Sequence, residues 1–167
     1  TVLFLGDVIG KPGRKAVGRY LEETRADFVV INGENLAGGI GITTRTAVEM
    51  LSLGVDAITT GNHVWKKKEV VPFLMEEKRV VRPLNYPRGT PGFGYTVVRK
   101  NDLSLCVANI EGRIFMNSLD CPFRAMEEFL EMERPDAPII VDFHAEATSE
   151  KIAMGWYLDG KVTALMG

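Results

Sequence analysis

Short runs of aliphatic and β-branched residues alternate along the chain with stretches in which apolar positions recur every three or four residues. Runs of the first kind predict buried strands, and the amphipathic stretches predict helices that pack through one face. This alternation is typical of an α/β fold with a mostly parallel sheet, and we expect the first half of the chain to be doubly wound. Strands are predicted at residues 2–5, 28–31, 57–60, 95–99, 104–108, 139–143 and 162–166.

Turn and capping residues delimit the predicted helices. Pro12 and Gly13 are expected to separate the first strand from a helix that carries Val17, Tyr20 and Leu21 on one face. Further helices are predicted from a cap at Thr43 or Thr44 to a stop at Gly54, over residues 124–133, and from a cap at Thr148 or Ser149 onward. Residues 66–77 are also helix-like, but Pro72 fits only a first turn, so the start of this helix stays open.

The pattern changes after residue 80. Three prolines and three glycines between residues 83 and 94 exclude regular structure over about a dozen residues, a length that is often functional in a compact domain. The strands at 95–99 and 104–108 flank Asn101 and Asp102, a turn pair typical of an antiparallel hairpin. The sheet structure is therefore expected to be mixed but largely parallel.

Composition and charge narrow the class of protein. The 167 residues fit one domain, because a domain has roughly 150 residues, and 46% apolar with 25% charged residues is globular. A net charge of -2 leaves no broad cationic field, so we expect no extended nucleic-acid surface. No apolar run approaches the roughly 18 residues of a membrane span, and the two cysteines fit a reduced cytoplasmic protein. We therefore expect a cytoplasmic protein without a membrane partner.

Oxygen and imidazole side chains follow several of the predicted strands. They are Gly6-Asp7, Gly33-Glu34-Asn35, Gly61-Asn62-His63 and His144. Because ligands of open α/β sheets bind beyond the carboxyl ends of the strands, we expect these side chains to converge on one rim. The glycine before each of the first three groups is expected to let the backbone turn sharply off the strand.

Carboxylates, carboxamides and imidazoles together suit a pair of transition-metal ions. Imidazole favours Zn, Mn or Fe, and carboxylate or amide oxygens accommodate Mn and Fe. Glu34 could bridge two cations about 3.5–4 Å apart, and such a pair activates water and stabilises an in-line phosphoryl displacement. Of the adjacent Asn62 and His63, one could bind metal while the other reaches the substrate.

Each residue also has a plainer interpretation. Asp7 could be a turn or capping residue, Glu34-Asn35 could form a solvated turn, and either histidine could be structural. Taken together these explanations are weaker, because both histidines of the chain and four oxygen groups would have to reach one sheet edge independently.

Distinctive motifs occupy residues 5–10, 32–35, 61–65, 82–87, 89–92 and the long segment 142–151. These motifs resemble those of the YmdB-like branch of the calcineurin-like metallophosphoesterases, over essentially the whole chain. The resemblance implies a single metallophosphoesterase domain over residues 1–167, an αββα sandwich, and a bacterial cytoplasmic phosphodiesterase that acts on cyclic nucleotides. It also implies two metal ions, with Fe or Mn favoured over Zn or Mg.

The same resemblance implies a role for each residue of the rim. Asp7 and Asn35 would bind one metal, Glu34 would bridge, and Asn62 and His144 would bind the second. His63 would donate a proton to the leaving oxygen. The family continues beyond the position of Gly167 with Thr-His-Thr-His, whose histidines complete the two metal shells, so the chain is expected to be incomplete at its C-terminus. Lys66 also departs from the family, which often has Asp after the tryptophan.

Two functions remain open from the sequence. The first is a phosphodiesterase in which a hydroxide activated by two metals hydrolyses a small phosphodiester, a 2',3'- or 3',5'-cyclic nucleotide. The alternative is a non-catalytic α/β module that binds a nucleotide or effector. We also expect the protein to form a homo-oligomer.

Overall fold

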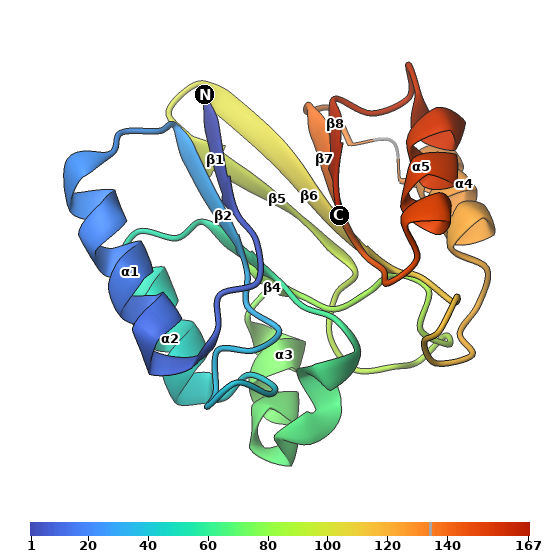
Figure 1. The fold of residues 1–167 in the computed structure, drawn as a ribbon. Helices are drawn as coiled ribbons and strands as arrows, with labels where there is room; N and C mark the ends of the chain where they lie inside the picture. The colour runs from blue at the N-terminus through green and yellow to red at the C-terminus, as the bar shows by residue number, and fades with distance from the viewer. Residues whose placement is uncertain (134) are drawn as a thin grey trace.

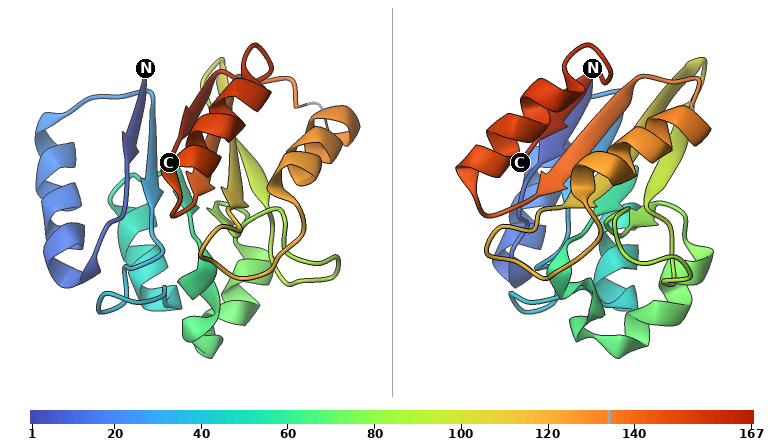
Figure 2. Two further views of the ribbon diagram at one scale, coloured as in Figure 1. Left: turned by 45° about the vertical axis from the view of Figure 1, so that its right-hand side comes forward. Right: turned by 90° about the vertical axis from the view of Figure 1, so that its right-hand side faces the viewer.

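The computed structural model describes residues 1–133 and 135–167 and shows four layers. Two four-stranded sheets pack face to face, and helices cover the outer side of each sheet (Figure 1). The chain is therefore an αββα sandwich of mixed, largely parallel sheets, as expected. The left view of Figure 2 shows the same order of layers, with α1 and α5 on opposite sides of the molecule.

The first half of the chain builds sheet A, in which all strands are parallel in the order β1-β2-β3-β4. The strands are β1 (Val2–Leu5), β2 (Phe28–Asn32), β3 (Ala57–Thr59) and β4 (Val80–Val81). The helices are α1 (Gly10–Glu23), α2 (Thr44–Ser52) and α3 (Val71–Glu76), with two short 3₁₀ turns, η1 (Asn62–Lys66) and η2 (Lys68–Val70), before α3.

The second half builds sheet B in the order β5-β6-β7-β8. Its first two strands form the predicted antiparallel hairpin, and the remaining pairs are parallel. The strands are β5 (Tyr95–Lys100), β6 (Leu103–Glu111), β7 (Ile139–His144) and β8 (Ala164–Met166), and the helices are α4 (Pro122–Met132) and α5 (Thr148–Leu158).

The prediction of a doubly wound first half is wrong. The strand order of sheet A never reverses, and right-handed crossovers then place every helix on the same face. The other face of sheet A packs against sheet B, so every residue of β2 is buried. The apolar layer between the sheets includes Phe28, Val30, Ala57, Val98, Leu105, Val107 and Ile140.

Most predicted strands and helices are present, with shifted ends. Pro12 and Gly13 lie inside α1 and not before it, because a proline in the first helical turn has no hydrogen bond to lose. Thr43 caps α2 through a capping box with Thr46. The predicted cap of α5 is wrong, since Thr148 is its first residue and the capping position holds Ala147. Strand β4 was not predicted, because two valines are too short a pattern.

None of the helices within residues 1–133 and 135–167 combines the length and the apolar character needed to cross a membrane.

Candidate metal centre

The carboxyl ends of strands from both sheets open into one cleft of about 780 Å³. Sheet A contributes residues that follow β1, β2 and β3, and sheet B contributes residues of β7 and β8 together with the start of α5. Figure 1 shows β1 and β8 at neighbouring edges of the two sheets. Polar residues that line the cleft are Asp7, Asn32, Glu34, Asn35, His63, Asp142, His144, Glu146 and Lys151.

The structure brings all of the predicted site residues together in one continuous series of contacts. Asn35 Nδ2 donates to Asp7 Oδ1 over 2.8 Å, and Asn35 Oδ1 lies 3.1 Å from His63 Nδ1. The same His63 nitrogen lies 2.8 Å from Glu34 Oε1. The other carboxylate oxygen, Oε2, lies 2.9 Å from His144 Nε2, which is 3.0 Å from Asn62 Oδ1.

Glu34 lies at the centre of this series and divides it into two halves. One oxygen faces the half that holds Asp7, Asn35 and His63, and the other faces the half that holds Asn62 and His144. Glu34 is buried, and within the described residues its Oε2 has no hydrogen-bond partner of acceptable geometry despite the nearby imidazole. A buried carboxylate oxygen without a hydrogen bond is costly unless something else compensates its charge.

Gly61 leaves the space in which these groups meet. A Cβ atom at this position would overlap Oε2 of Glu34 and the ring of His144. The backbone of Gly61 is extended, with φ at −163°, so the residue is needed for space and not for an unusual conformation.

The predicted role of the preceding glycines as turn formers is wrong. Neither Gly6 nor Gly33 has a positive φ; the left-handed conformation is found at Asp7, with φ at 41°. A non-glycine residue seldom adopts this conformation, and such residues cluster at functional sites.

Asn32 and Asp142 connect the two sheets at the wall of the cleft, and neither was predicted to belong to the site. Asn32 Nδ2 donates to Asp142 Oδ2 over 2.8 Å, and the hydroxyl of Thr59 donates to the same oxygen. Burial raises the pKa of Asp142, although these two donors oppose the shift. The signal in the sequence was a charge inside the otherwise apolar run of residues 139–143.

Glu111 is a second buried carboxylate beside the site, and it too was missed. It pairs in register with His144 across β6 and β7, and no hydrogen bond to either of its carboxylate oxygens is found in the described part of the chain. Burial raises the pKa of Glu111 to about 7. Burial lowers the pKa of His144, but Glu34, Asp142 and Glu111 together hold that pKa above its ordinary value.

The donor set fits two cations only if the carboxamides take part. Among the described residues, no three His, Cys, Asp or Glu side chains are grouped so that they could hold one metal ion. If His63, which is not predicted to bind metal, is left aside and Glu34 is counted in both halves, each half has two such residues and one asparagine. Carboxamide, carboxylate and imidazole are all ligands that Mn and Fe accept.

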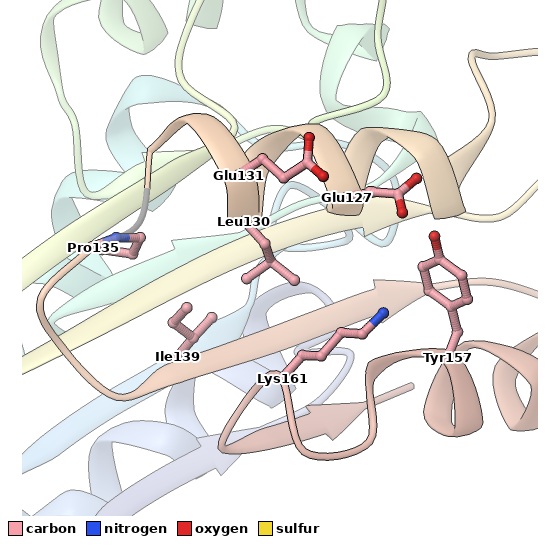
Figure 3. Close-up of a pocket in the computed structure, with 7 residues that line it drawn as sticks. All are labelled: Glu127, Leu130, Glu131, Pro135, Ile139, Tyr157 and Lys161. Atoms are coloured by element: carbon pink, nitrogen blue, oxygen red, sulfur yellow. The ribbon is translucent and has the colours of Figure 1, made fainter.

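A different cleft, of about 450 Å³, lies between α4 and α5 on the outer side of sheet B (Figure 3). No predicted site residue lines it. Its residues are Glu127, Leu130, Glu131, Pro135, Ile139, Tyr157 and Lys161.

Comparison with known proteins identifies the family and several relatives of this chain. The profile of a family described as "YmdB-like protein" matches residues 3–167. A 2',3'-cyclic-nucleotide 2'-phosphodiesterase of Bacillus subtilis is 46% identical, over 99% of this chain and 65% of that protein. The crystal structure of a hypothetical protein from Thermus thermophilus is 48% identical with a TM-score of 0.92, covering 98% of this chain and 65% of that one.

A crystal structure described as that of a novel phosphatase from Mycoplasma pneumoniae is 34% identical with a TM-score of 0.87, over 97% of this chain and 61% of that one. The chain thus spans a little under two thirds of the length of these relatives.

Proposed function

The chain belongs to the YmdB-like protein family, and from this membership and the geometry of the cleft we propose that it forms the metal-binding part of a phosphodiesterase acting on cyclic nucleotides. The 2',3'-cyclic nucleotides are the preferred substrate class, because the Bacillus subtilis relative is named for them. The 3',5'-cyclic nucleotides are the second substrate class to be tested.

The observation that carries the proposal is the division of the site by Glu34. Asp7, Asn35 and Glu34 Oε1 would hold one ion, and Asn62, His144 and Glu34 Oε2 would hold the other. The Glu34 oxygen that lacks a hydrogen bond would then be compensated by a cation. Two such cations, with Fe or Mn favoured, would activate water and neutralise the charge of the phosphoryl group.

His63 is proposed as the proton donor to the leaving group. Its Nδ1 faces Glu34 and Asn35, and its side chain is 29% exposed, so the ring is fixed from one side and accessible from the cleft. Protonated His63 would donate to the ribose oxygen as the phosphorus–oxygen bond breaks. General acid catalysis of this kind contributes typically about 10²–10⁴-fold to the rate.

The test is hydrolysis of 2',3'-cyclic AMP by the intact protein loaded with manganese. We expect turnover that a chelator abolishes, and a loss of about 10²–10⁴-fold in His63→Ala with manganese affinity retained. No turnover by the manganese-loaded protein, or an undiminished rate in His63→Ala, would overturn the proposal. Metal-independent nucleotide binding without turnover would favour the non-catalytic binding module instead.

A further inference from the structure

Lys151 brings a positive charge into the metal-site cleft, whose other charged side chains include four carboxylates. Of the described residues that line it, Lys151 is the one lysine or arginine, and it shares the cleft with the carboxylates of Asp7, Glu34, Asp142 and Glu146. Within the described part of the chain no carboxylate lies within salt-bridge distance of its ammonium group. The charge of Lys151 is therefore available to a ligand in the cleft.

The start of α5 holds Lys151 in this position. The preceding residue, Glu150, is buried, and its carboxylate accepts hydrogen bonds from the backbone N–H groups of Arg113 at 2.9 Å and Ile114 at 3.2 Å. Successive residues of an α-helix point about 100° apart. The Glu150 side chain therefore reaches the backbone of Arg113, while Lys151 lines the cleft. Met154 and Leu158, buried on the sheet side, fix the helix further along.

Lys151 is the positive charge that the sheet B side of the cleft offers to an anion. The two proposed ions would lie against Glu34, whereas Lys151 is carried by sheet B's helix α5 beside Glu146 and Ala145. Lysine presents a compact charge with three donors, which suits a phosphate oxygen.

We propose that Lys151 binds a non-bridging phosphate oxygen of the substrate and thereby sets the affinity of the cleft for phosphodiesters. This assignment rests on the function proposed above, since it takes the ligand of the cleft to be a phosphodiester. Lys151 would then contact the phosphate group from the side of sheet B, while the two ions would contact the same group from the side of Glu34. Removal of its charge should weaken phosphate binding and leave metal binding intact.

The test measures the binding of inorganic phosphate to the intact, manganese-loaded protein by calorimetry. We expect Lys151→Met to weaken binding about 10- to 100-fold, the usual effect of losing a hydrogen bond to a charged group, and Lys151→Arg to retain most of the affinity. Lys161→Met is the matched control, because Lys161 lies on the same side of the sheet, 4.4 Å from the ring centre of Tyr157 in the cleft of Figure 3. It should bind phosphate as the natural protein does.

A second readout separates this proposal from the proposed function. Lys151→Met should raise KM for 2',3'-cyclic AMP more than it lowers kcat, with unchanged manganese affinity and unchanged thermal stability. Phosphate binding that is the same in Lys151→Met and the natural protein would overturn the assignment of Lys151, even if turnover is observed. An equal loss in Lys161→Met would also overturn it. Absence of turnover with the phosphate effect intact would reject the phosphodiesterase and keep the anion site.

Discussion

The side-chain amide of Asn32 donates a hydrogen bond to Asp142 over 2.8 Å, and this bond joins β2 of one sheet to β7 of the other. Asn32 Oδ1 also accepts the backbone N–H of Glu34 at 3.2 Å. Glu34 lies two residues after Asn32, and His144 lies two residues after Asp142. The pair thus fixes the relative position of the two strands that carry the central contact of the site.

Asp142→Ala should therefore destabilise the fold. The substitution leaves the side chains of Asn32 and Thr59 without their buried acceptor, which we expect to cost about 2–4 kcal/mol. Asp142→Asn is the control, because it keeps an acceptor oxygen and removes a charge that burial disfavours. Urea unfolding would measure both variants. Equal losses for Ala and Asn would show that the hydrogen bonds between the sheets contribute little.

Glu34→Gln should remove the response of the protein to manganese. The carboxamide keeps one oxygen acceptor, but the site then lacks the charge shared between its two halves. A ligand at about 100 times its Kd stabilises the folded state by about 2.7 kcal/mol, so manganese should raise the Tm of the natural protein and not that of the variant. Glu128→Gln, on the exposed side of α4, is the matched control. An unchanged manganese response in Glu34→Gln would exclude Glu34 as a ligand.

The local pattern predicted the strands better than it predicted their arrangement. Apolar runs identify β1 and β7 within a residue, because both faces of these strands are covered and polar residues are excluded from most positions. The pattern could not show whether helices or a second sheet covers the inner face of sheet A, since either provides an apolar surface. That distinction came from the family resemblance, and the non-reversing strand order gives its physical reason.

The site was predictable to the extent that its residues follow strands. Asp7, Glu34 and His63 each come shortly after the end of a parallel strand, so the rule for strand ends places them together from the sequence alone. Asn32, Asp142 and Glu111 were missed for the opposite reason. Asn32 and Glu111 are the last residues of β2 and β6, and Asp142 lies inside β7. A polar residue that still belongs to a strand looks like the end or an interruption of an apolar run, and its contacts show only in the structure.

Glu111 should make the stability of the metal-free protein depend on pH. Burial raises its pKa to about 7 in the folded state, against the ordinary value of 4.5 that applies when the chain is unfolded. Between these pH values the folded state holds a proton that the unfolded state has lost. The free energy of unfolding should therefore fall as pH rises through this window, and level off above about 7.

Glu111→Gln should remove this component, which we expect to be about 2 kcal/mol. The measurement is urea unfolding of chelator-treated protein at the two ends of the window, with Glu128→Gln as a control of equal charge. The difference between natural protein and Glu111→Gln should grow as pH rises. A difference that stays constant with pH would contradict a raised pKa at Glu111.

Gly61→Ala should disrupt the metal centre without straining the backbone. The φ of −163° at this position is open to alanine, so the only cost is the overlap of the new Cβ with Glu34 Oε2 and the His144 ring. Displacing these two side chains should weaken manganese binding about 10- to 100-fold, as loss of support around metal ligands typically does.

Gly155→Ala provides the matched control for that substitution. Gly155 lies inside α5 with no atom within 4 Å of a Cβ placed there, so alanine should stabilise the helix by roughly 0.5–1 kcal/mol and leave manganese affinity unchanged. Calorimetric titration of both variants decides the matter. If Gly61→Ala binds manganese as tightly as Gly155→Ala, manganese binding does not depend on the positions of Glu34 and His144. The proposal that Glu34 is shared between two metal ions would then be rejected.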